Sequence, residues 1–182
     1  MICTALLGAA ALLGGPVDSE VAPYPFVAAT QHGRAYFKML PDPKGKYDRD
    51  KGSGTVYEVK AVGPDEALWS VEGWYAYDVF LANDGEHVIR MGNWPQGQEP
   101  EQADLAVAFY RKDRLLASYS TADVILDPSK VRPSVSHYMY RGEVPVLDRR
   151  AMQLRLVSVD RVEWIFDVTT GKVVSQKQLP PK

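Results

Sequence analysis

Two serines and a histidine lie close together in the second half of the chain, at Ser134, Ser136 and His137. A serine nucleophile needs a histidine that takes its proton and a carboxylate that orients the histidine. Neighbouring residues of a strand point to opposite faces, so we expect Ser136 and His137 not to pair. The Gly-x-Ser-x-Gly turn of the α/β-hydrolases does not occur in the sequence. We interpret these residues as a polar strand end and assign no catalytic residue.

The Gly-rich loop around Asp48 and Asp50 has the alternating acidic residues of some calcium sites, with Ser53 following. Calcium takes roughly six to eight oxygen ligands, and a bidentate Glu closes the typical loop at its twelfth position. Here Gly52 stands at the third ligand position, and Val59 stands at the twelfth. We therefore interpret the segment as a solvated surface loop.

The three histidines, His32, His87 and His137, are far apart and lack metal-ligand spacing. A zinc site needs three or four converging ligands. The single cysteine, Cys3, lies in an apolar N-terminal segment and offers no thiol to the rest of the chain. No metal site and no cofactor are predicted, and His87 is expected to be a half-buried strand residue.

Aromatic residues are dense between positions 69 and 94. Exposed aromatic rings stack on sugars or anchor protein partners, because they bury a large area at a low entropic cost. Trp69 shares a strand face with Val71, and Trp164 shares one with Phe166, so both are assigned to the core. Trp74, Tyr75 and Trp94 lie near strand ends or in loops, so they are the predicted ligand-binding residues.

Composition is that of a globular protein. The 182 residues are 46% hydrophobic and 24% charged, with a net charge of -2 from interspersed acidic and basic residues. A basic stripe is missing, so nucleic acid is not predicted as a partner. After the N-terminal segment no run of about 18 apolar residues follows, and no transmembrane helix is predicted.

Residues 1–19 have the character of a secretory signal, because Ile2–Gly15 is almost wholly apolar yet too short for a bilayer. Cleavage after Ser19 is expected, with Ala9–Ala11 as a second option. Because no Lys or Arg precedes the apolar run, a buried N-terminal helix is the alternative. We predict a single domain over residues 20–182, exported to the periplasm or secreted.

The elements that would position these side chains are strands. The clearest hairpin joins Tyr77–Ala82 to His87–Met91 through Asn83-Asp84-Gly85, residues that tolerate positive φ. Alternation with a period of two predicts further strands before and after it. These strands are expected at 26–30, 34–40, 55–62, 67–72, 104–110, 114–120, 134–140, 152–158, 162–168 and 172–178.

The connections are mostly short, which favours antiparallel neighbours because a parallel pair needs a crossover of about a dozen residues. At most one short helix is expected, within 122–132 after a Thr121 cap, and Pro128 limits its length. The segment Gly142–Leu147 is predicted to be a connection. The fold class is all-β: an antiparallel meander of hairpins, arranged as a β-sandwich or a partial propeller, since a complete propeller needs four or more blades of about 40 residues.

Several segments resemble uncharacterised exported bacterial proteins with propeller-blade-like repeats. These segments are Leu68-Trp69-Ser70, Val79–Gly85 with Val88-Ile89-Arg90 and Trp94, Val107–Tyr110, Leu115–Tyr119, Ser134–His137 and Phe166–Val174. The resemblance covers about half of the chain. It implies a fold style and export, but no activity.

Three functions follow as hypotheses. The first is a non-catalytic exported domain that binds a protein or an envelope component, and the strand pattern favours it. The second is a carbohydrate-binding module that uses Trp74, Tyr75 and Trp94. The third is an unrecognised hydrolase that depends on His137.

Overall fold

The structure is a computed structural model that describes residues 21–42, 44 and 51–181. The predicted signal segment, residues 1–19, lies outside the described residues. So do Asp48 and Asp50 of the candidate calcium loop.

Twelve strands in the described ranges form three antiparallel sheets, each built from four consecutive strands. The first sheet contains β1 (Phe26–Ala29), β2 (Ala35–Leu40), β3 (Ser53–Glu58) and β4 (Glu66–Glu72). The central sheet contains β5 (Val79–Leu81), β6 (His87–Met91), β7 (Leu105–Arg111) and β8 (Arg114–Ser120). The last sheet contains β9 (Val146–Asp148), β10 (Gln153–Val157), β11 (Val162–Asp167) and β12 (Val173–Gln178). The predicted all-β antiparallel meander is confirmed.

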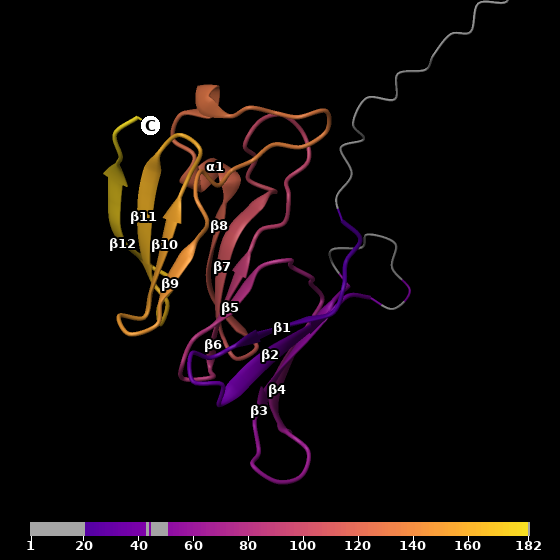
Figure 1. Cartoon of the computed structure of the whole chain (residues 1–182). Helices are drawn as coiled ribbons and strands as arrows, with labels where there is room; N and C mark the ends of the chain where they lie inside the picture. Colours follow the sequence, from indigo (N-terminus) through magenta and orange to yellow (C-terminus); the bar gives the residue numbers. More distant parts are fainter. Residues whose placement is uncertain (1–20, 43, 45–50, 182) are drawn as a thin grey trace, which may run out of the picture.

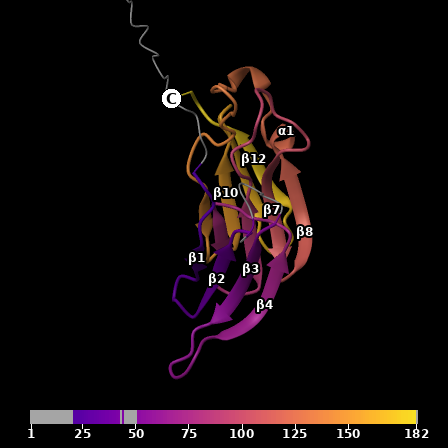
Figure 2. The same cartoon turned by 90° about the vertical axis from the view of Figure 1, so that its right-hand side faces the viewer.

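The central sheet packs between the other two (Figure 1). On one side, Ile89 and Phe109 join a core with Leu154 and Phe166 of the last sheet. On the other side, Val88 joins a core with Phe37 of the first sheet. A view turned by 90° shows the strands running roughly lengthwise along the molecule (Figure 2).

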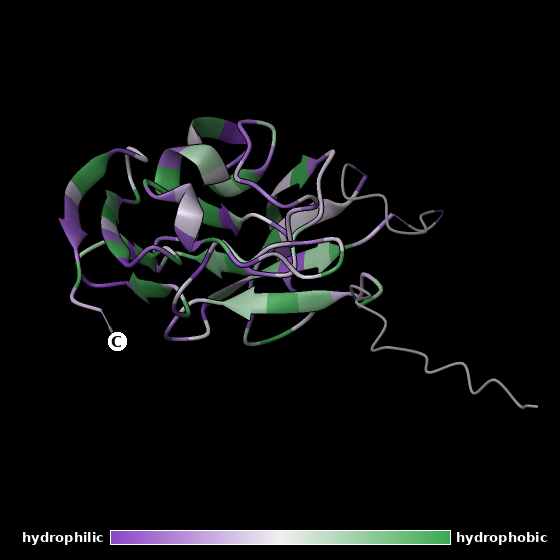
Figure 3. Ribbon diagram, turned by 90° about the horizontal axis from the view of Figure 1, so that it is seen from above, coloured by the Kyte–Doolittle hydropathy of each residue, from purple (hydrophilic) through white to green (hydrophobic). Residues whose placement is uncertain are grey.

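Two-residue periodicity explains why strands such as β2 and β11 bury one face. In β11, Val162, Trp164 and Phe166 are buried while Glu163 and Ile165 are partly exposed. Figure 3 shows the same alternation as changes between hydrophobic and hydrophilic colours along the strands. The hairpin predicted around Asn83-Asp84-Gly85 forms with Val79 opposite Arg90, and Gly85 has a φ of 67°.

Trp69 and Trp164, predicted to be core residues, do pack against the two cores. Trp164 is 7% exposed and donates its indole Nε1–H to the carbonyl of Val124 at 2.9 Å. Trp69 is partly buried against the core between the first and central sheets, and its indole donates to the carbonyl of Gly85 at 2.9 Å.

The predicted helix and its cap, and the predicted connection before β10, need correction. The helix α1 is only Thr121–Val124, and its N-cap is Ser120 rather than Thr121, because Ser120 and Asp123 form a reciprocal capping box. Pro128 opens a separate 3-10 turn, Pro128–Lys130, where its missing N–H costs nothing. The predicted connection before residue 148 contains the edge strand β9.

The β11–β12 turn shows how closely the last sheet approaches the central one. A Cβ on Gly171 would lie 2.6 Å from the Cβ of Ala117 in β8, and its φ is 71°. The hydroxyl of Tyr119 donates to the carbonyl of Gly171 at 2.9 Å. Glycine alone adopts this positive φ without strain and leaves room for Ala117, so the turn packs directly against the central sheet.

Candidate functional site

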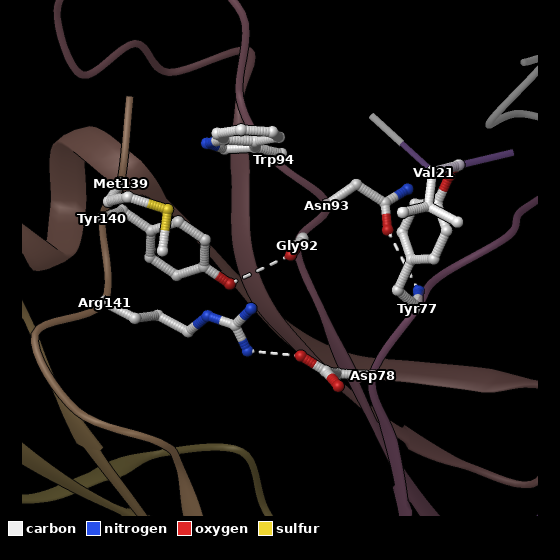
Figure 4. Close-up of a pocket in the computed structure, with 9 residues that line it drawn as sticks. All are labelled: Val21, Tyr77, Asp78, Gly92, Asn93, Trp94, Met139, Tyr140 and Arg141. Carbon is white, nitrogen blue, oxygen red and sulfur yellow. Dashed lines mark hydrogen bonds and ion pairs between the residues drawn. The ribbon is translucent and has the colours of Figure 1, made fainter. Parts of the chain in front are cut away.

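A cavity of about 310 Å³ lies beside Trp94, and it is the candidate functional site (Figure 4). Three segments distant in sequence enclose it, together with Val21. Tyr77 and Asp78 lead into β5, Gly92 to Trp94 follow β6, and Met139 to Arg141 come from the segment before β9. Its volume is at the lower end of the range of ligand cavities, roughly 300–1,000 Å³.

Gly92 fixes one wall of the cavity by its contact with β7. Its N–H donates to the carbonyl of Ala106 at 2.8 Å, and a Cβ would lie 1.6 Å from the carbonyl oxygen of Leu105. A larger residue would therefore push the two backbones apart.

Tyr140 lies in the opposite wall of the cavity and bonds to the backbone of the same segment, Gly92, and of β7. Its buried hydroxyl lies 2.9 Å from the carbonyl oxygen of Ala106 and 3.1 Å from that of Gly92. Burial raises the pKa of Tyr140 above its usual value, so the hydroxyl stays protonated as a donor.

Asn93 ties the remaining wall to the segment before β5. Its Oδ1 accepts from the backbone N–H of Tyr77 at 3.2 Å, and its Nδ2 donates to the carbonyl of Tyr75 at 2.9 Å. The hydroxyl of Tyr77 donates to the carbonyl of Val21. Backbone groups thus use much of the hydrogen-bonding capacity of these two side chains.

An ion pair lies at the rim of the cavity, where the guanidinium of Arg141 is 2.5 Å from the carboxylate of Asp78 (Figure 4). The same guanidinium lies over the ring of Tyr140, 5.5 Å from its centroid. Beyond this pair the surface continues into a second recess, lined also by Glu143, Val144 and Pro145.

Trp94 is partly exposed and supplies an aromatic wall. His137 stacks on its ring at 4.8 Å between centroids, with 24° between the planes. His137 is not among the residues that line the cavity. Among the predicted binding residues, Trp94 is the one that reaches a cavity surface.

Trp74 and Tyr75 are placed in the core, so the argument from exposed aromatic rings does not apply to them. Trp74 is 5% exposed and stacks between Phe37 at 6.0 Å and Tyr110 at 5.7 Å. The hydroxyl of Tyr75 donates to the carbonyl of Tyr24 at 2.9 Å. The sequence places both residues before a strand, but the sheets close over them.

The expectation that Ser136 and His137 do not pair is wrong. The Ser136 Oγ and the His137 Nδ1 are 2.8 Å apart. The segment is a tight reversal, in which the N–H of Ser134 donates to the carbonyl of His137 at 2.7 Å, rather than a strand with alternating side chains. His137 is buried, like His87, whose Nδ1 lies 2.6 Å from the Asp84 carboxylate.

Sequence reasoning missed Asp78, Met139 and Arg141. Asp78 and Arg141 are 63 positions apart, and no local pattern brings them together. Among the described residues, no group of three or more His, Cys, Asp or Glu side chains converges as a metal site.

No protein-family model matches this chain, and no curated protein matches it. The similarity to exported proteins with propeller-blade-like repeats therefore stays a prediction. Within the described ranges, no helix combines the length and the apolar character needed to cross a membrane.

Proposed function

We propose that this chain is a non-catalytic binding domain that holds an apolar side chain of a partner protein in the cavity beside Trp94. The observation that carries the proposal is the combination of an aromatic wall with polar groups that already bond within the protein. Asn93 and Tyr140 bond to main-chain atoms, and Asp78 and Arg141 bond to each other.

An apolar ligand fits this lining better than a sugar does. A sugar ring needs polar groups whose hydrogen bonds are still available, because burying its hydroxyls unpaired costs free energy. Trp94 and the half-exposed Met139 offer apolar contact area instead, and Met adapts readily to different side chains. The Asp78–Arg141 pair would contact the backbone or charges of the partner at the rim.

The test uses capped tripeptides, Ac-Ala-X-Ala-amide, with leucine, phenylalanine or tryptophan as X. We expect these peptides to shift the amide resonances of Gly92, Asn93 and Arg141 in a heteronuclear NMR titration. The peptide with alanine as X should shift them far less. Trp94→Ala should abolish the shifts, whereas Val62→Ala, at a position that is 91% exposed in the β3–β4 turn, should not.

Two other results would replace this proposal. Binding of methyl glycosides at Trp94 without peptide binding would favour the carbohydrate-binding module. Turnover of ester or glycoside substrates that is lost in His137→Ala would favour the hydrolase.

We also propose that the domain works outside the cytoplasm, on the basis of the apolar residues 1–19. Mass spectrometry of the protein expressed with this segment should find a mature chain that begins at Glu20. An uncut chain in the cytoplasmic fraction would contradict export.

A further inference from the structure

A second cavity, of about 700 Å³, lies where turns of all three sheets meet. The β1–β2 turn contributes Gln31 and His32, and the β5–β6 turn contributes Asn83. The end of β9 and the β9–β10 connection contribute residues 147–150. In each sheet this is the turn that joins the first strand to the second. We call this cavity the three-turn cleft.

Contacts between the turns set the form of the cleft before any ligand arrives. The backbone N–H of Gln31 donates to the Asn83 Oδ1 at 2.9 Å, and the Asn83 Nδ2 lies 3.5 Å from the Gln31 Oε1. One Nη of Arg149 lies 3.5 Å from the carbonyl oxygen of Ala29, at the end of β1. Each sheet is therefore linked to another at this point, which is how a binding site is preorganised.

The cleft carries positive charge that the protein does not neutralise. In the described part of the chain, Arg149 and Arg150 form no ion pair, whereas four other arginines do: Arg111, Arg141, Arg155 and Arg161. The one acidic residue of the lining, Asp148, uses its Oδ1 to accept from the N–H groups of Arg150 and Ala151, each at 2.9 Å. The lining therefore holds two arginines and one carboxylate.

Arg149 is only partly solvated as well. Its Nε is buried and has no hydrogen-bond partner among the described residues. A buried donor of a charged group without a partner is costly, and such groups in native proteins call for an explanation. An anion on the exposed side of the guanidinium would pair with its positive charge through the Nη groups.

We propose that the three-turn cleft binds a soluble organic phosphate. The guanidinium groups of Arg149 and Arg150 would hold the phosphoryl oxygens, because the arginine fork matches phosphate geometry and two cations suit a dianion. The amide groups of Gln31 and Asn83 would contact the polar remainder of the ligand. A cleft of this volume holds more than an inorganic phosphate ion.

The test is a calorimetric titration at low ionic strength with three probes: glucose 6-phosphate, inorganic phosphate and glucose. Glucose 6-phosphate should bind most tightly, inorganic phosphate more weakly, and glucose not at all. Arg149→Gln and Arg150→Gln should each weaken binding about tenfold or more, equivalent to about 1.4 kcal/mol. Arg132→Gln removes the same charge from an exposed site outside the cleft and should change affinity less than about twofold.

Urea unfolding curves of each variant establish that it is folded before binding is measured, and Arg150, being exposed, provides the safer substitution. Equal binding of glucose and glucose 6-phosphate would overturn the proposal, as would equal losses in Arg132→Gln and Arg149→Gln. Sedimentation with phosphatidylglycerol vesicles, without binding of glucose 6-phosphate, would assign the surface to lipid headgroups instead. Trp94→Ala should leave phosphate binding unchanged, so this site and the Trp94 cavity are tested separately.

Discussion

The two cavities lie beyond opposite ends of the short strand β5. They differ in whether the charged side chains that line them form ion pairs. Before β5, Asp78 pairs with Arg141, and the Trp94 cavity is enclosed by side chains that bond to the protein itself. After β5, Asn83 leads into a cleft where Arg149 and Arg150 have no described ionic partner. The first end satisfies its polar groups internally and offers apolar surface; the second leaves positive charge available to a ligand.

The largest expected effect separates the core tryptophan from the cavity tryptophan. Trp74→Ala should lower the free energy of unfolding by about 3–5 kcal/mol, because it removes the ring between Phe37 and Tyr110 and leaves a void. Trp94→Ala removes a partly exposed ring and should cost only about 1–2 kcal/mol. Urea denaturation measures both, and equal losses would show that Trp94 is a core residue too.

Tyr140→Phe tests whether the hydroxyl holds the two cavity walls together. It leaves the carbonyl groups of Gly92 and Ala106 without that donor, so stability should fall by about 1–3 kcal/mol. The matched control is Tyr36→Phe, which removes an exposed hydroxyl bonded to Asp65 and should cost less than about 0.5 kcal/mol. Similar values for the two variants would contradict the anchoring role of Tyr140.

Low pH should destabilise the fold through Asp84, which lies in the β5–β6 turn beside the three-turn cleft. Burial alone would raise the pKa of Asp84, but hydrogen bonds from the N–H groups of Glu86 and His87 and from the His87 ring outweigh it and lower that pKa. A carboxylate with a lowered pKa stabilises the fold above its unfolded pKa, near 3.9, and this stability is lost as the pH falls through the folded value.

The variant that isolates this effect is Asp84→Asn. Its unfolding free energy should depend less on pH than that of the unmodified protein between about pH 5 and pH 2. Asp113→Asn, in the exposed β7–β8 turn, should leave the acid dependence nearly unchanged. If the unfolding free energies of Asp84→Asn and of the unmodified protein fall in parallel with pH, Asp84 does not contribute to the acid dependence.

The sequence predicted the fold better than the site because strands obey local rules. The alternation of Val162, Trp164 and Phe166 and the turn at Asn83-Asp84-Gly85 give the strands directly. Burial of Trp74 depends instead on Phe37 in the first sheet and Tyr110 in the central sheet. The Asp78–Arg141 contact likewise depends on how segments far apart in the sequence pack together. The two-residue alternation along a strand carries no information on that packing.

The smallest expected effect gives the most direct comparison of the two ends of β5. A double-mutant cycle with Asp78→Asn and Arg141→Gln should give a coupling of about 0.2–1 kcal/mol that falls as salt is added, because the pair is partly exposed. Arg149→Gln should cost less than about 0.5 kcal/mol, because it removes the long hydrogen bond to Ala29 together with an unpartnered buried donor. Residues kept for binding rather than for folding commonly behave this way. A loss of more than about 1 kcal/mol in Arg149→Gln would mean that this arginine supports the fold, and the contrast between the two ends would then disappear.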